Sequence, residues 1–259
     1  MSPRVSVGVS LKMYFGHADA RRWFERVAGL AAAHPAVADG RVECFVIPTY
    51  LQVLPAVAAF DGTRVVVGAQ DVATDDSGAF TGEVSAAELA EVGVRVAEVG
   101  HAERRRLFGE TDEVVASKTA AALRNGIAPV LCLGEAERAD AADAAVATIG
   151  QLRSALEGSP AGRVLVAYEP VWAIGAPEPA PVEHIAEVTR VLRAELAAIP
   201  GREGSLVIYG GSAGPGLLTR LGDSVDGLFL GRFAHDPAAL ADVLDEAAAL
   251  ADRREEAIA

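Results

Sequence analysis

The sequence predicts one α/β domain over residues 1–259, a (β/α)8 barrel of eight parallel strands. Strand-like apolar runs recur about every thirty residues, and helical patterns lie between them without a linker-like break. The runs are almost continuously apolar rather than alternating, as expected of parallel strands that are buried on both faces. A doubly wound open sheet is the structural alternative. Eight regularly spaced units in 259 residues favour closure into a barrel.

The elements can be assigned in chain order. The expected strands are short apolar segments, at Val5–Ser10, Arg41–Ile47, Arg64–Gln70, Val94–Gly100, Ile127–Leu133, Arg163–Tyr168, Ser205–Tyr209 and Gly227–Leu230. The segments between them are rich in Ala, Leu and Glu and predict helices, for example Glu113–Arg124, Ala136–Leu156, Val182–Ile199 and Pro237–Leu250. Ser85 and Glu88 have the spacing of a capping box. We expect the charged residues 252–259 to form a frayed tail.

The composition excludes several classes of function. The net charge of −13 argues against nucleic acid or a membrane surface as a partner. Charged residues interrupt every apolar stretch before it could span a bilayer, and Met1–Val5 leads straight into the first strand, so we expect neither a membrane segment nor a signal peptide. Cys44 and Cys132 each lie in an apolar run, which indicates buried thiols in a reducing compartment, the cytoplasm.

No cofactor and no metal are expected. The acidic and histidine residues do not group at the spacing of metal ligands. No Gly-x-Gly-x-x-Gly fingerprint follows a predicted strand, so a bound dinucleotide is not indicated. Because the chain is acidic, an anionic substrate would need a local positive site.

Three ionisable side chains follow three different predicted strands. Lys12 follows the first strand, His101 the fourth and Glu169 the sixth. Parallel strands of a barrel end at one rim, so these side chains should meet there. Glu169 precedes a small, apolar loop that closes on Gly175, and a base under a closable lid suits proton abstraction beside a carbonyl. The alternatives are a helix-capping carboxylate for Glu169 and a core residue for His101.

The chain resembles the triosephosphate isomerase family over nearly its whole length. The matching segments occur in family order, at Leu11–Met13, Gly78–Glu83, Gly100–Arg105, Phe108–Thr111, Cys132–Glu135, Tyr168–Gly175 and Tyr209–Ser212. The resemblance implies a TIM barrel and an isomerase that moves a proton between adjacent carbons through an enediol(ate). It makes Glu169 the base and Lys12 a positive charge for the substrate. His101 becomes a neutral electrophile at a helix N-terminus, a tuning for which triosephosphate isomerase is itself the standard example.

The resemblance also assigns supporting groups. Glu103 corresponds to the carboxylate that holds the lysine, although an ordinary first-turn glutamate is an equal alternative. The phosphate of a small phosphorylated sugar would bind backbone N–H groups of Gly175, Gly211, Ser212 and Gly231. The loop Gly78–Glu83 corresponds to the segment by which family members interlock as homodimers. Phe80 on such a loop favours a partner over exposure to water.

Four departures from the family pattern bear on the substrate. Ser10 and Leu11 replace Asn and Trp, and Ala102 replaces Ser. The far end of the lid, 175–181, carries three prolines, which stiffen it. Arg232 replaces a glycine, and its guanidinium could bind phosphate or point outward to a carboxylate.

Together the departures resemble the branch that isomerises tetrulose phosphates, in which L-erythrulose 1-phosphate becomes D-erythrulose 4-phosphate. That substrate carries an extra hydroxymethyl group at its non-phosphate end, and the smaller Ser10 opens space there. The alternative is the triose reaction of dihydroxyacetone phosphate and D-glyceraldehyde 3-phosphate. Outside this chemistry stand a catalytically silent barrel that acts as a binding module and another phosphate-binding barrel enzyme. Retention of Lys12, His101 and Glu169 argues against the former, and the intact lid with its Glu169 against the latter.

Overall fold

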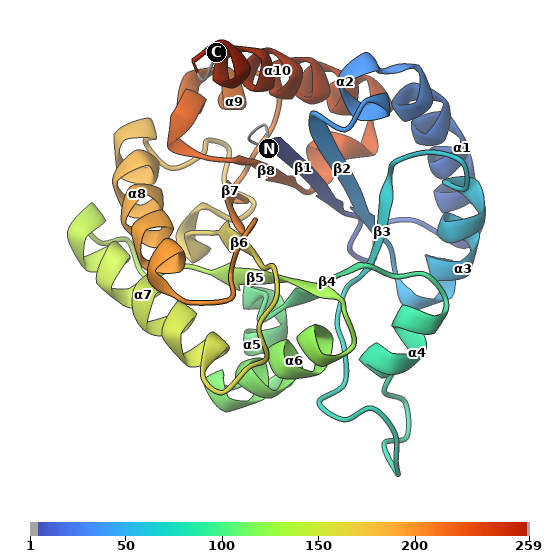
Figure 1. Cartoon of the computed structure of the whole chain (residues 1–259), viewed down its shortest axis with the longest axis horizontal. Helices are drawn as coiled ribbons and strands as arrows, with labels where there is room; N and C mark the ends of the chain where they lie inside the picture. Colours follow the sequence, from blue (N-terminus) through green and yellow to red (C-terminus); the bar gives the residue numbers. More distant parts are fainter. Residues whose placement is uncertain (1–4, 258–259) are drawn as a thin grey trace.

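The computed structural model describes residues 5–257 and confirms the predicted fold class. Eight parallel strands close into a barrel in sequence order, and β8 pairs with β1 (Figure 1). The strands are β1 (Val5–Ser10), β2 (Val42–Ile47), β3 (Val66–Ala69), β4 (Val96–Val99), β5 (Ala128–Leu133), β6 (Leu165–Tyr168), β7 (Leu206–Tyr209) and β8 (Gly227–Leu230). β1 and β8 have the predicted bounds, and the others begin one or two residues inside them.

Helices surround the barrel on its outside (Figure 1). The α-helices are α1 (His17–Ala33), α2 (Pro35–Ala38), α3 (Tyr50–Ala59), α4 (Ala86–Glu91), α5 (Ala102–Phe108), α6 (Asp112–Arg124), α7 (Ala141–Leu156), α8 (Val182–Ala198), α9 (Leu217–Leu221) and α10 (Pro237–Glu256). Residues 5–257 also form three short 3-10 helices, η1 (Val171–Ala173), η2 (Gly222–Ser224) and η3 (Arg232–His235). Of the helices that the described part of the chain forms, none is long and apolar enough to cross a membrane.

Two hydrophobic cores account for the continuously apolar strands. The larger core lies between the barrel and its helices, and the smaller one fills the barrel interior. Alternate residues of one strand therefore enter different cores, as Val96 of β4 faces inward and Ala97 outward. In the interior, the rings of Phe45 and Phe229 stack 5.8 Å apart, and a side chain at Gly8 would overlap the Phe45 ring. The barrel is thus a packed core below its rim.

Capping explains where some helices begin. The Ser85 side chain accepts a hydrogen bond from the backbone N–H of Glu88, as the capping-box spacing predicts. α7 begins at Ala141 rather than at the predicted Ala136, because Asp140 caps the helix by accepting from the N–H of Asp143.

The chain end differs from the predicted frayed tail. α10 continues to Glu256, and its last turns are anchored because Arg254 pairs with Asp223 and Asp226. Residues 258 and 259 of the predicted tail lie outside the described residues.

Candidate active site

A cavity of about 900 Å³ opens at the carboxyl ends of the strands. Its walls come from the segments after β1, β4, β6, β7 and β8. It brings together nearly all of the predicted site residues: Ser10, Lys12, His101, Glu103, Glu169, Gly175, Ser212, Gly231 and Arg232. Gly211 is the exception. It is buried with its Cα turned to the Tyr209 hydroxyl, and its neighbour Gly210 lines the cavity instead.

Lys12 is held at the rim in a strained backbone conformation. Its φ of 49° lies in the left-handed region, which a residue with a side chain rarely adopts. The Gln70 side-chain amide stabilises this turn by donating to the Lys12 carbonyl oxygen over 2.9 Å. The ammonium group donates to Glu98 Oε1 over 2.7 Å. Burial alone would lower the pKa of Lys12, but the carboxylates of Glu98 and Glu169 raise it above its usual value.

The hydrogen-bonded partner of Lys12 is therefore Glu98, a residue that sequence reasoning missed. Glu103, which the resemblance assigns to hold the lysine, has its carboxylate 3.9 Å from Lys12 Nζ. The signal for Glu98 was present, because it is the one acid within the otherwise apolar end of the fourth strand, Val96–Val99. A charged residue in a fully buried strand is rare unless it has a partner.

His101 caps α5 and is oriented by it. Its Nδ1 accepts a hydrogen bond from the backbone N–H of Glu103 over 3.1 Å. Because Nδ1 is the acceptor, the proton of the neutral ring lies on Nε2. Nε2 is 3.5 Å from Glu169 Oε2 and 3.9 Å from Glu98 Oε1. The ring can therefore present an N–H donor to the cavity between two carboxylates.

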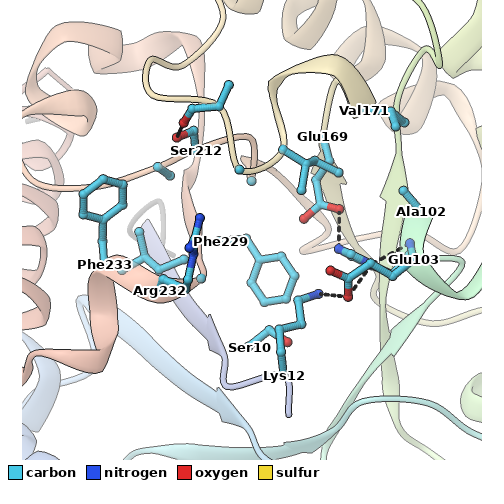
Figure 2. A pocket seen from close by; sticks show the side chains of 18 of the residues that line it. Ser10, Lys12, Ala102, Glu103, Glu169, Val171, Ser212, Phe229, Arg232 and Phe233 are labelled. Atoms are coloured by element: carbon cyan, nitrogen blue, oxygen red, sulfur yellow. Dashed lines mark hydrogen bonds and ion pairs between the residues drawn. The ribbon is translucent and has the colours of Figure 1, made fainter. Parts of the chain in front are cut away.

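Glu169 lies at the end of β6 with its side chain directed into the cavity (Figure 2). It is 5% exposed, and its Oε2 has no hydrogen-bond partner among residues 5–257. Burial raises the pKa of Glu169. The nearby His101 and Lys12 partly offset this rise, whereas the charge on Glu98 adds to it. Gly210 leaves room for this side chain, since an added Cβ would lie 2.5 Å from Oε1. A buried carboxylate without full hydrogen bonding is a competent base.

We expect Glu169→Gln to stabilise the free protein in a pH-dependent way. The folded pKa of Glu169 lies above its value of 4.5 in the unfolded chain, so ionisation destabilises the folded state. The cost is present above the folded pKa, declines as the pH falls through it, and is gone below 4.5. Denaturant unfolding of both proteins over a pH series should show a gap in unfolding free energy that closes toward acid pH. A gap of the same size at every pH contradicts the expectation.

The opposite side of the cavity offers groups suited to an anion. Figure 2 places Arg232 and Ser212 across the cavity from Glu103 and Ala102. Arg232 lines the cavity and has no ion-pair partner in the part of the chain that the structure describes, so it does not point to a carboxylate. Gly175, with φ of 72°, brings the backbone of the lid near the guanidinium group of Arg232. A cation beside exposed backbone N–H groups can bind phosphate.

The loop after Glu169 has contacts at both of its ends. At the near end, the Trp172 indole N–H donates to Glu135 Oε1 over 2.8 Å, and the guanidinium of Arg138 lies over its ring. At the far end, the Ser212 hydroxyl donates to the Ala176 carbonyl oxygen over 2.7 Å. Few contacts at two ends are what a loop needs to close over a bound ligand.

Comparison with known proteins gives a consistent result. The sequence model of a protein family described as "Triosephosphate isomerase" matches residues 5–247. A protein of Pectobacterium atrosepticum named L-erythrulose-1-phosphate isomerase is 49% identical, with 97% of this chain and 99% of that protein covered. One of the same name from Mesorhizobium japonicum is 40% identical, covering 94% and 97%. A triosephosphate isomerase of Mycobacteroides abscessus is also 40% identical, but covers 82% and 84%.

A solved structure shares the fold. The crystal structure of triosephosphate isomerase from Bartonella henselae superimposes with a TM-score of 0.79 at 25% identity, covering 94% of this chain and 98% of that one.

Proposed function

Because the chain belongs to the triosephosphate isomerase family, we propose that it interconverts L-erythrulose 1-phosphate and D-erythrulose 4-phosphate. The chain is a sugar-phosphate isomerase. The observation that carries the proposal is the cavity in which a buried carboxylate, an imidazole N–H and an ammonium group converge opposite an unpaired arginine. Relatives named L-erythrulose-1-phosphate isomerase, matched over nearly their full length, favour the four-carbon substrate.

In the proposed reaction, Glu169 removes the proton from the carbon next to the carbonyl group and returns it to the former carbonyl carbon. Lys12 stabilises the negative charge that develops on the carbonyl oxygen of the substrate, and His101 Nε2–H donates a hydrogen bond to the same oxygen. His101 then moves a proton between the two oxygens of the enediol(ate). The proton count is unchanged over the cycle, so the chain's own residues suffice for the reaction.

Paired kinetics on the purified protein test this proposal. We expect a higher kcat/KM with L-erythrulose 1-phosphate than with D-glyceraldehyde 3-phosphate. A preference for the triose would mean that the chain interconverts triose phosphates, the runner-up function. A relative named triosephosphate isomerase at 40% identity favours this alternative. Turnover of neither substrate would favour a catalytically silent barrel.

We expect Arg232→Gln to weaken substrate binding. Loss of a charged hydrogen bond to phosphate should raise KM about 30-fold, while kcat changes little because the phosphate is bound alike in the ground and transition states. Initial-rate kinetics with the tetrulose phosphate give both constants. Arg153→Gln removes a guanidinium that pairs with Glu195 on the helices and should leave both unchanged. An unchanged KM in Arg232→Gln would exclude the residue from the phosphate site.

We also propose that the protein is a homodimer assembled through the loop Gly78–Glu83. The segment between β3 and α4, which contains this loop, projects from the barrel (Figure 1), and its Phe80 is 44% exposed. Two other large apolar side chains are also exposed. Met13, after β1, is 90% exposed, and Leu51, on α3, is 87% exposed. Such surface is costly in water and is typical of an interface.

The free thiols of Cys44 and Cys132, both buried, support an enzyme of the reducing cytoplasm.

Phe80→Asp should convert the dimer to a monomer, because a charge replaces an apolar contact in the interface. Sedimentation velocity at micromolar concentration measures the change. Val146→Asp is the control, since Val146 is an even more exposed apolar residue, on helix α7, and its replacement should leave the assembly intact. A monomeric unmodified protein would contradict the proposed interface.

A further inference from the structure

Glu98 is a buried carboxylate with one partner at the end of β1 and one just after it. It is 2% exposed and lies two residues after Val96, which faces the barrel interior, so it faces the interior as well. Its Oε1 accepts from Lys12 Nζ and its Oε2 from the Ser10 hydroxyl, both over 2.7 Å. Both partners follow or end β1, whereas β4 pairs only with β3 and β5. The contact therefore crosses the barrel just below the cavity.

A buried carboxylate such as Glu98 costs the protein stability, so we expect it to have a role that compensates for this cost. A carboxylate loses its hydration when it enters an apolar strand, and a buried ion pair rarely stabilises a fold by itself. Burial opposes its ionisation, but Lys12, His101 and the two hydrogen bonds together hold the pKa of Glu98 below its usual value. Glu98 is therefore charged at neutral pH and acts only as a hydrogen-bond acceptor.

The charge on Glu98 fixes the direction of the Ser10 hydroxyl. A hydroxyl has one proton, and Ser10 donates it to Glu98. Ser10 also lines the cavity, so it can offer only its lone pairs to a ligand there. An amide at this position would offer both a donor and an acceptor, and a serine free to rotate would offer either.

We propose that Glu98 is a positioning residue that orients Ser10 to accept a hydrogen bond from the terminal hydroxymethyl group of a four-carbon sugar phosphate. The inference rests on the proposed function and deepens it. Figure 2 shows Ser10 and Lys12 between Arg232 and Glu103, so a substrate whose phosphate lies beside Arg232 and Ser212 meets them as it extends across the cavity. A triose phosphate ends at the reacting carbon and has no further hydroxymethyl group beyond that carbon to donate this bond. Glu98 thereby contributes to selection of the four-carbon substrate through Ser10.

The test is the selectivity, the kcat/KM for L-erythrulose 1-phosphate divided by that for D-glyceraldehyde 3-phosphate. Ser10→Ala and Glu98→Gln should each lower it about tenfold, mainly through a higher KM for the tetrulose. Glu98→Gln also releases Lys12 from its ion pair. This release should lower kcat for both substrates alike, so its effect cancels in the selectivity. A purely structural role would reduce both activities equally and leave the ratio unchanged.

Three further variants sharpen the result. Glu98→Gln should not lower the selectivity further in a Ser10→Ala background, because the two residues act as one unit. Ser6→Ala is the matched control. Ser6 lies on the same strand, and its hydroxyl donates a hydrogen bond of 3.0 Å to Glu43, away from the cavity. If Glu98→Gln does not fold, Glu98→Asp replaces it, since the shorter side chain keeps the charge and withdraws from Ser10.

The possible outcomes separate the two proposals. If the unmodified protein prefers the triose, the proposed function is wrong. If it prefers the tetrulose and the selectivity of the Ser10 and Glu98 variants matches that of Ser6→Ala, only this inference is overturned.

Discussion

Glu169→Gln is expected to lower kcat about 10³-fold with L-erythrulose 1-phosphate, while KM changes little. The amide cannot take up the proton that the reaction must move, whereas it keeps the size and hydrogen bonding of the side chain. General acid–base catalysis contributes roughly 10²–10⁴-fold in enzymes, and in the proposed reaction one group both removes and returns the proton. The expected loss therefore lies near the middle of that range.

Two measurements check this prediction. Steady-state turnover gives kcat, and uptake of deuterium from D2O by the substrate reports proton abstraction separately. Both should fall together in Glu169→Gln. Glu195→Gln is the control, because Glu195 lies on α8 and pairs with Arg153 away from the cavity. Retention of deuterium uptake in the Glu169 variant would assign proton abstraction to another group, for which Glu98 and Glu103 are the nearest carboxylates to His101.

The convergence of Lys12, His101 and Glu169 in one cavity was predictable from the sequence because it depends on local information. Each of Lys12, His101 and Glu169 follows an apolar run, and a barrel brings all such positions to one rim. The orientation of His101 also follows from its position before a helix, which supplies the N–H of Glu103 to its Nδ1. No side-chain geometry had to be known for these three to meet.

The contacts of Glu98 depend on information that the sequence does not display. They link β4 to β1 across the barrel, so they follow from the stagger of all the strands rather than from any local pattern. Glu103, which the resemblance assigns to hold Lys12, lies on helix α5 with its side chain partly in solvent and its carboxylate 3.9 Å from Lys12 Nζ. The end of α10 is a similar case, since the ion pairs of Arg254 with Asp223 and Asp226 join distant segments.

Lys12→Met should reduce both catalysis and stability. The ammonium group is a positive charge that acts on both Glu98 and Glu169, and in the proposed reaction it stabilises the charge that develops on the substrate oxygen. Removal of one such group costs about 10²–10³-fold in kcat. It also leaves the buried carboxylate of Glu98 without its cation, which should destabilise the fold by about 3 kcal/mol at neutral pH.

The pH dependence distinguishes this loss from ordinary mispacking. Without Lys12, burial of Glu98 should raise its folded pKa above the unfolded value of 4.5, so lowering the pH should protonate Glu98 and restore stability relative to the unmodified protein. Denaturant unfolding at several pH values measures this difference. A deficit that stays constant as the pH falls would mean that the methionine side chain, and not the unpaired charge, destabilises the protein.

Lys118→Met separates the two effects of Lys12→Met. Lys118, the other lysine of the chain, is buried and pairs with Asp71 and Glu110 over 2.7 and 2.6 Å, away from the residues that line the cavity. Its loss should destabilise the protein by a similar amount while kcat per folded molecule is kept. If both variants lost kcat alike, the catalytic defect of Lys12→Met would be a consequence of lost stability. If only Lys12→Met loses kcat, its ammonium group acts on the substrate itself.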